Sequence, residues 1–447
     1  SDATGASDQA EPVTSWAEDK NVVWKVETLG QGSGTPILWE GKIYYLAAIN
    51  TGKKAGADDG GSPGNAAVPT APAGSQFVQD APPSPRGGDR RRRGFGDFGD
   101  GPLPDFAKPY DKDEDGKLDE EEREAMRAAF RGRNRRGGGG RGGFGSRKPT
   151  EIHQFVVVCV DAATGKQLWK KVAREELPHE GHHRDHGFAS ASPVTDGKRL
   201  IASFGSRGIF AFDMDGKKIW ENDLGDMQTR AGFGEGASPA LYDGTVVVPW
   251  DHEGDSFIVA LDASDGTEIW RKGRPSGTSW ATPLVVEVEG KPQVVVPSQD
   301  SVKAYDLKTG ATVWETDGLT ANVIPSPVTD GELVIAMSGF RGSKLRAIQL
   351  GRTGKLSEGE GVAWTGDEGT PYVPSPLLYD GRLYFFQGNT NILTCLDAKT
   401  GKAHFSRERV DGLRGVYASP VGAAGHIYLL GREGNCVVLA AGDTLEV

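Results

Sequence analysis

The most regular pattern along the sequence is a short apolar run that ends at an aspartate, followed by a glycine-containing turn and a second run that ends at tryptophan. One copy runs from Phe155 to Val160, turns through Asp161-Ala-Ala-Thr-Gly165 and ends at Trp169. An aspartate that can hydrogen-bond to its own turn, followed by a glycine that accepts positive φ, predicts two strands joined by a tight turn.

This unit is repeated along the chain. The further copies are Asp213 to Trp220, Asp262 to Trp270, Asp306 to Trp314 and a weaker Asp397 to Phe405. Ser-Pro or Thr-Pro pairs recur in step with it, ending at Pro36, Pro193, Pro239, Pro283, Pro327, Pro376 and Pro420. From Pro193 onward the spacings are 46, 44, 44, 49 and 44 residues. A period in the forties that holds four short strands is typical of a β-propeller blade.

One tryptophan recurs at the end of each unit. The set comprises Trp24, Trp169, Trp220, Trp270, Trp314 and Trp364. We expect these side chains to pack between neighbouring blades, because each buries a large apolar area.

The first spacing is much longer, since Pro36 and Pro193 are 157 residues apart. The extra residues are rich in Gly, Pro, Ser and Arg and cannot bury enough apolar surface to fold, so most of them are predicted to be disordered. The predicted division is therefore a polar segment at 1–20, a propeller at 21–49 and 151–447, and an insertion at 50–150. In a meander of four strands, this insertion leaves from the same face as the linkers between blades.

The number of blades stays open between seven and eight. Residues 21–27 resemble the last strand of a blade, and such a strand commonly completes the C-terminal blade. Residues 443–447, however, are predicted to begin a fourth strand of the seventh blade. The strand around Trp24 then pairs awkwardly with the seventh blade or belongs to an eighth, and we favour the eighth.

Composition narrows the class of protein. No apolar run approaches the eighteen residues of a membrane helix, so we expect no transmembrane segment. The formal charge of −11 argues against a nucleic-acid partner.

The chain begins with serine and shows no signal region, which indicates a processed chain or a fragment. Cys159, Cys395 and Cys436 lie in apolar runs and are expected to be buried fillers, which leaves the redox compartment open.

The sharpest motif lies in the insertion, at residues 111–122. It matches the twelve-residue EF-hand loop: a glycine, Gly116, stands at position 6, and the ligand positions hold Asp111, Asp113, Asp115, Lys117, Asp119 and Glu122. Calcium needs several hard oxygen ligands around one centre, and this spacing supplies them. The motif predicts a Ca²⁺ site, and the alternative is a solvated acidic run.

A second candidate is the linker from Pro178 to His186, which holds four of the eight histidines. An acidic cluster, Trp250 to Asp255, is expected on the same face. Imidazoles with carboxylates are ligands of zinc and other transition metals. A metal or anion site at the propeller mouth would use His182, His183, His186, His252 and Glu253. The alternative is a loop fixed by local hydrogen bonds, because the spacing matches no defined metal motif.

The arginine- and glycine-rich flanks of the insertion contain interleaved phenylalanines, as some RNA-binding segments do. Nearby acidic residues balance their charge, which favours a soluble linker. No nucleophile and base stand in a recognisable arrangement, so we assign no catalytic residue.

The repeat Asp-Ala-x-Thr-Gly-x-x-x-Trp resembles the tryptophan-docking repeat of quinoprotein (PQQ-type) β-propellers. Together with the EF-hand insertion, it resembles exported propeller proteins of Planctomycetes-type bacteria. The resemblance implies either a quinoprotein dehydrogenase, usually eight-bladed, or a non-catalytic scaffold that binds proteins. The dehydrogenases typically carry adjacent cysteines over the quinone and a calcium held by Glu, Asn and Asp. This sequence has no adjacent cysteines, so bound PQQ is not expected.

These observations predict an all-β propeller of seven or eight four-stranded blades with a largely disordered insertion that carries one calcium loop. The resemblance implies an exported periplasmic or cell-surface protein. We expect a scaffold that binds a protein or another envelope ligand at its top face. The alternative is a quinone- or metal-dependent oxidoreductase with its site at the mouth.

Overall fold

The computed structural model describes residues 6–7, 12–56 and 148–447. The described residues all belong to one compact unit, formed by Ser1–Gly60 with Phe144–Val447. The predicted calcium loop at 111–122 and most of the predicted insertion lie outside the described residues. In the part that is described, no helix has the length and apolarity needed to span a membrane.

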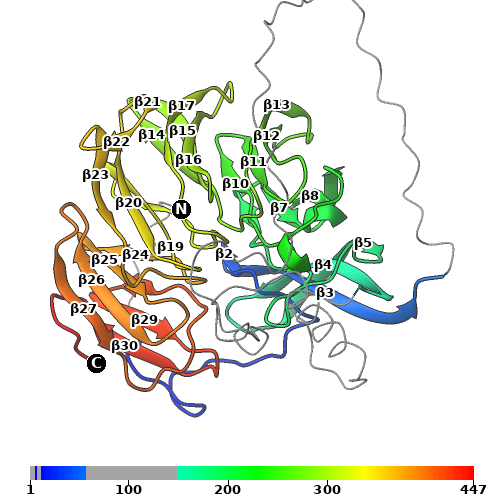
Figure 1. Ribbon diagram of the computed structural model, residues 1–447. Helices are drawn as coiled ribbons and strands as arrows, with labels where there is room; N and C mark the ends of the chain where they lie inside the picture. Colours follow the sequence, from blue (N-terminus) through cyan, green and yellow to red (C-terminus); the bar gives the residue numbers. More distant parts are fainter. Residues whose placement is uncertain (1–5, 8–11, 57–147) are drawn as a thin grey trace, which may run out of the picture. The chain divides into compact units, whose positions relative to one another are not determined.

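The unit is built from seven antiparallel meanders that follow one another in chain order around a ring (Figure 1). Each of the first six has four strands in the order of the chain. Sheets 1 to 3 consist of β2 (Ile37–Trp39), β3 (Lys42–Lys54), β4 (Glu151–Asp161) and β5 (Gln167–Glu176); β6 (Val194–Thr195), β7 (Arg199–Ser203), β8 (Ile209–Asp213) and β9 (Lys218–Asn222); and β10 (Ala240–Tyr242), β11 (Thr245–Trp250), β12 (Phe257–Asp262) and β13 (Glu268–Gly273).

The next three sheets repeat this order. They consist of β14 (Leu284–Val288), β15 (Lys291–Pro297), β16 (Ser301–Asp306) and β17 (Thr312–Asp317); β18 (Val328–Thr329), β19 (Leu333–Ser338), β20 (Lys344–Gln349) and β23 (Gly361–Gly366); and β24 (Leu377–Tyr379), β25 (Arg382–Phe386), β26 (Ile392–Asp397) and β27 (Ala403–Arg409). A long β20–β23 turn adds two short parallel strands, β21 (Gly354–Lys355) on β17 and β22 (Ser357–Glu358) on β23. The predicted propeller of four-stranded blades is confirmed.

The seventh sheet differs from the others. Its antiparallel strands are β28 (Val421–Ala423), β29 (His426–Leu430) and β30 (Cys436–Ala440), and its fourth strand is β1 (Ala6–Ser7), which pairs in parallel with β28. The strand predicted at 443–447 does not form. Those residues turn back on β30 through one backbone hydrogen bond, from Ala440 N to Glu446 O, at 3.0 Å.

The core lies between neighbouring sheets. Six clusters of buried apolar side chains each combine two consecutive sheets, from sheets 1 and 2 to sheets 6 and 7. Almost every residue of the central strands is buried; β8 and β19 are examples. Burial on both faces explains why these strands are nearly continuous apolar runs. The three cysteines are free; Cys159 and Cys395 are buried and Cys436 is half-buried.

The repeated aspartate and tryptophan act as predicted. Asp161 Oδ1 accepts hydrogen bonds from the backbone and hydroxyl of Thr164, at 2.8 and 2.7 Å, and these bonds lower the pKa of Asp161. The tryptophan of one sheet then docks on the turn of the next. Trp220 Nε1 donates to Ala263 O at 2.9 Å, and its indole covers Gly266, where a Cβ would lie 2.7 Å from the ring.

The segment 21–27 was predicted as a strand, and this prediction is wrong. Residues 22–28 form no ladder with any described strand. Trp24 nevertheless docks on sheet 1 as Trp220, Trp270 and Trp364 dock on the next sheet, with Nε1 donating to Ala162 O at 2.9 Å and the ring against Gly165. The Trp24 side chain therefore holds this segment against sheet 1. Its backbone pairs with no described strand.

The Ser-Pro and Thr-Pro pairs form a second joint between sheets, on the inner side. Backbone N–H groups donate to the serine hydroxyl one repeat further on, at 2.8 to 3.2 Å. The pairs are Thr35 to Ser192, Ser192 to Ser238, Thr282 to Ser326, Ser326 to Ser375 and Ser375 to Ser419. The second repeated motif is thus a chain of hydrogen bonds that joins consecutive repeats.

Candidate functional site

The linkers between sheets and the β-loops on the same face meet at the mouth of the propeller, and Arg230 links several of them. Arg230 lies in the short helix η3 (Arg230–Gly232), between β9 and β10. Its Nε donates to Glu253 of sheet 3 at 3.2 Å. Its Nη1 donates to Gln299 of sheet 4 and to Asn322 of the following linker, each at 3.2 Å. Arg230 therefore connects the β9–β10 linker to sheet 3, to sheet 4 and to the linker that follows sheet 4.

The histidine-rich linker connects β5 to β6 and packs against the next linker. His182 Nδ1 lies 2.8 Å from His183 O, and its ring meets Phe188 edge-on with centroids 4.5 Å apart. His183 N donates to Phe233 O at 2.8 Å, and the two rings lie 5.4 Å apart. Aromatic packing and backbone hydrogen bonds therefore orient both imidazoles.

His186 is half-buried in the same linker. Its Nδ1 lies 2.6 Å from Ser190 Oγ, while Nε2 is buried without a hydrogen-bonding side chain. Burial lowers the pKa of His186 to about 4, with His182 and His183 adding to the effect. Gly234 and Gly236 pack against the ring, where a Cβ would come within 3.2 and 3.0 Å. The imidazole is therefore neutral at physiological pH.

His252 and Glu253 lie in the β11–β12 loop, and each has its own contacts. His252 Nδ1 accepts from Gln228 N at 3.1 Å. Glu253 Oε1 accepts from Arg230 and from the backbone and hydroxyl of Thr278, and these bonds lower its pKa although burial opposes the shift. Asp251, in the same acidic cluster, is buried in a two-bonded ion pair with Arg274, at 2.9 and 3.1 Å.

The structure thus brings His182, His183 and His186 into one linker and holds His252 and Glu253 by separate contacts of sheet 3. Within residues 6–7, 12–56 and 148–447, no group of three or more His, Cys, Asp or Glu side chains is arranged to hold a metal ion. The metal or anion site at the mouth stays a prediction.

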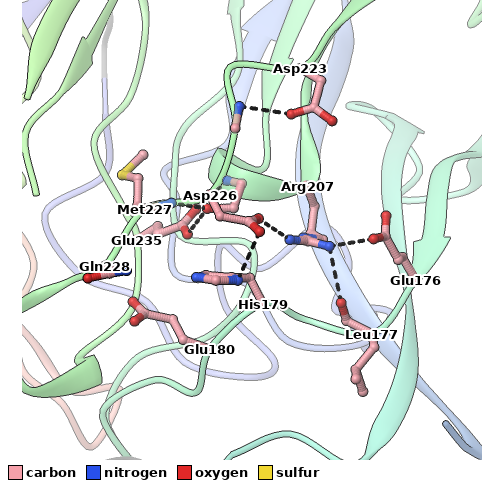
Figure 2. Close-up of polar contacts among 12 residues, drawn as sticks. Glu176, Leu177, His179, Glu180, Arg207, Asp223, Asp226, Met227, Gln228 and Glu235 are labelled. Atoms are coloured by element: carbon pink, nitrogen blue, oxygen red, sulfur yellow. Dashed lines mark hydrogen bonds and ion pairs between the residues drawn. The ribbon is translucent and has the colours of Figure 1, made fainter. Parts of the chain in front are cut away.

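A small cavity lies beneath this linker and is lined by residues of sheets 1 to 3. Figure 2 shows the polar contacts among residues at its wall. Arg207, which is 9% exposed, lies on its wall. Nη1 donates to Glu176 and Nη2 to Asp226, each at 2.5 Å, and Asp226 also meets His179 Nδ1 at 3.1 Å. The volume of about 40 Å³ fits about three water molecules, because a water needs about 10–15 Å³ on this measure.

Glu235 closes the other wall of this cavity. Its carboxylate accepts hydrogen bonds from the backbone N–H and the hydroxyl of Ser206, and the same hydroxyl accepts from Met227 N at 2.8 Å. Burial raises the pKa of Glu235 to about 7, against the effect of the Ser206 bonds. Ser206, in the β7–β8 loop, therefore bonds to Met227 and to Glu235, which lie on either side of Arg230 in the β9–β10 linker.

No sequence pattern pointed to Arg207, Arg230 or Glu235 as site residues. Arg207 could have been noticed, since it is a charged residue in a glycine-flanked loop between two largely apolar strands. Such a residue is buried only when it is paired. Arg230 and Glu235 gave no local signal, because their partners are distant in sequence.

Aromatic side chains and arginines surround the mouth. Phe340, in the β19–β20 loop, stacks on Tyr372 with centroids 4.8 Å apart, and Arg341 lies over Phe340 at 5.3 Å. Arg432, in the β29–β30 loop, lies over Tyr417 at 4.3 Å and pairs with Asp185 of the histidine linker at 2.8 Å. These residues are exposed or half-buried. We call Phe340, Arg341, Tyr372, Tyr417 and Arg432 the aromatic rim.

Comparison with known proteins agrees with this architecture. A family model described as outer membrane protein assembly factor BamB matches residues 153–275 and 206–441. The chain is similar to tetrathionate hydrolase of Acidithiobacillus ferrooxidans, at 23% identity over 296 residues, which cover 61% of this chain and 53% of that protein. It is also similar to BamB of Alkalilimnicola ehrlichii, at 28% identity over 153 residues, which cover 33% of this chain and 38% of that protein.

Both curated relatives are matched over about half of their length or less. Among solved structures, the chain resembles BamB from Moraxella catarrhalis at 19% identity and a TM-score of 0.42. That similarity covers 57% of this chain and 70% of the other.

Proposed function

We propose, because this chain belongs to the family of the outer membrane protein assembly factor BamB, that it is a non-catalytic scaffold of the bacterial cell envelope. In this proposal the protein is exported to the periplasm or cell surface and binds a protein partner through the mouth of the propeller. The partner class is an outer membrane protein undergoing assembly. The EF-hand loop of the insertion binds Ca²⁺ in the same proposal.

The aromatic rim is the observation that supports protein binding. Tyrosine, tryptophan and arginine are enriched among the residues that dominate binding energy at protein interfaces. Here Tyr372, Tyr417, Arg341 and Arg432 belong to different loops of one face, and ring stacking or an ion pair fixes each of them. Preordered side chains lose less conformational entropy on binding, which favours recognition by this face.

The test is the affinity of the purified chain for a urea-unfolded outer membrane β-barrel protein, measured by fluorescence anisotropy after dilution into buffer. Arg341→Ala and Tyr417→Ala are expected to weaken binding about tenfold each, as for truncation of interface hot spots. Arg352→Ala is the matched control, since Arg352 is an exposed arginine in the β20–β23 turn on the opposite face. Unchanged affinity in the rim variants, or no binding by the wild-type chain, would contradict the proposal.

The competing proposal is a quinone- or metal-dependent oxidoreductase with its site at the mouth, in the loops 179–186 and 251–255. Its support is the gathering of four histidines in one linker. The cavity beneath that linker is far smaller than the roughly 300 Å³ of a typical cofactor pocket, so a quinone would bind at the open mouth. Stoichiometric retention of added PQQ after gel filtration, read by absorbance, would favour this proposal over the scaffold.

A further inference from the structure

The centre of the mouth contains a group of hydrogen-bond donors with unused capacity, and Arg230 is the first. Its Nε is taken by Glu253 and its Nη1 by two amide oxygens, whereas Nη2 has no side-chain acceptor among the described residues. About 30% of the side chain is exposed, so a ligand in the mouth can reach it. The backbone N–H of Arg230 donates to Thr278 Oγ1 at 2.9 Å, which fixes the residue in place.

Asn322 is the second donor. Its side chain is buried, with 1% of the residue exposed, and Oδ1 accepts from Arg230. The same amide carries Nδ2, which is buried and has no hydrogen-bond acceptor. Leaving a buried polar group unpaired is unfavourable, so an acceptor at this position is favoured. The residue adopts φ of 55°, which asparagine tolerates better than most residues.

Tyr372 is the third donor, and its interaction with the Asn322 side chain opposes part of the rise in the pKa of its phenol. Stacking on Phe340 fixes the ring. Burial raises the pKa of Tyr372, so the phenol keeps its proton and can donate. The three groups come from three different linkers of the ring, and all of them present N–H or O–H.

We propose that Arg230, Asn322 and Tyr372 form a carboxylate subsite at the propeller mouth, which receives an acidic side chain of the protein partner. This inference rests on the proposed function and adds the chemistry by which the partner is recognised. The subsite carries one positive charge, which Glu253 partly balances at Nε, and two neutral donors. That combination suits a monoanion with two acceptor oxygens, because charge-assisted hydrogen bonds are the stronger ones.

The test uses two fluorescein-labelled peptides, Gly-Ser-Val-Glu-Val-Ser-Gly and the same peptide with Gln at the centre, both with blocked ends. The wild-type chain is expected to bind the Glu peptide about tenfold more tightly. Asn322→Asp keeps the shape of the side chain but replaces the donor with a negative acceptor, and it should abolish the difference. Tyr372→Phe should reduce it. Arg184→Gln removes an exposed arginine of the same face and should leave it intact.

Equal affinity of the wild-type chain for the two peptides would overturn the inference, even if an unfolded outer membrane protein still binds and the proposed function stands. Binding of neither peptide would leave the decision to sodium acetate, titrated against sodium chloride at constant ionic strength. The side-chain amide resonances of Asn322 are identified by their loss in Asn322→Asp. Their shift with acetate supports the subsite independently of the proposed function, and their constancy rejects it.

Discussion

At the scale of single residues, the ion pair between Asp251 and Arg274 is buried most completely, with 2% and 3% of the side chains exposed. It joins the β11–β12 loop to the residue that follows β13, and Arg274 also donates to Tyr305 of the next sheet. Burial raises the pKa of Asp251, and Arg274 opposes that shift. A pair of this kind is costly to break, because removing one partner leaves an uncompensated charge.

Arg274→Met is therefore expected to lower the free energy of unfolding by about 3–5 kcal/mol, the range for a broken buried ion pair. The double variant Asp251→Leu, Arg274→Met should recover most of this loss, since no charge is left unpaired. Urea unfolding followed by tryptophan fluorescence measures both effects. A double variant as unstable as Arg274→Met would show that the ion pair stabilises the fold more than apolar packing at the same positions.

Glu235 predicts a pH dependence of stability. Its pKa is raised from 4.5 to about 7 in the folded protein, so the folded state retains its proton at pH values where the unfolded state has lost it. The stabilisation is complete below pH 4.5 and is lost as the pH rises toward 7, by up to about 3 kcal/mol. Glu235→Gln should remove this decline.

Urea unfolding of the wild type and Glu235→Gln at pH 5 and pH 8 makes the comparison. The difference between the two proteins isolates Glu235, because His186 and other titrating groups are common to both. Glu358→Gln, at an exposed glutamate of the β20–β23 turn, is the control. A stability difference that is the same at both pH values would contradict the prediction.

These residues also mark what local sequence can reveal. The Asp161 turn was predictable, because the hydrogen bonds that define it join residues three apart. The contact between Arg230 and Asn322 spans 92 positions and arises only when the ring brings the linkers together. The same holds for Glu235 and Ser206, which are 29 positions apart.

At the scale of elements, the segment around Trp24 shows how a side chain and a backbone can follow different rules. The apolar run at 21–27 has strand composition, but no described strand offers its edge to this segment, so no ladder forms. The indole still finds the carbonyl and glycine of the Asp161 turn. The repeat motif therefore predicted the docking correctly and the strand incorrectly.

Trp24→Ala is expected to destabilise the protein by about 1–3 kcal/mol, less than the roughly 3–5 kcal/mol of a buried tryptophan such as Trp220, because Trp24 is only half-buried. Trp16→Ala, at a site with 42% exposure, should cost less than about 0.5 kcal/mol. Urea denaturation of Trp16→Ala, Trp24→Ala and Trp220→Ala gives the order. Equal losses for Trp16 and Trp24 would show that the docking does not stabilise the ring.

At the scale of the whole molecule, the fold class was predictable from the repeat period and from the apolar strands, whereas the joins at the ends of the ring were not. Seven sheets are present in the described residues, and β1 pairs with the seventh on the edge opposite to β30. A two-residue parallel strand leaves no periodic pattern, so sequence could not place it.

The calcium loop provides the prediction for the full chain. Calorimetric titration with Ca²⁺ should give heat with a dissociation constant of about 10⁻⁴ to 10⁻³ M, the range of isolated extracellular hands. The variant Asp111→Ala, Glu122→Ala should give none. Heat that persists in this variant would place calcium elsewhere.

Zn²⁺ titrated into the same two proteins tests the histidine linker. If the linker binds zinc, the heat of Zn²⁺ binding should persist in the calcium-loop variant. It should disappear in His182→Ala, His183→Ala. The absence of a zinc response would contradict the metal site. The histidines would then have a structural role, through their aromatic contacts to Phe188 and Phe233.

The two joints between sheets have a consequence for how such a chain can evolve. A typical repeat carries an indole for its successor and a glycine turn for its predecessor, and on the inner side it carries both a donor N–H and an acceptor hydroxyl. Each repeat thus carries both halves of the two contacts that join neighbouring repeats. A duplicated or deleted repeat would meet compatible neighbours on both sides, so ring size can change by whole repeats without the invention of a new interface.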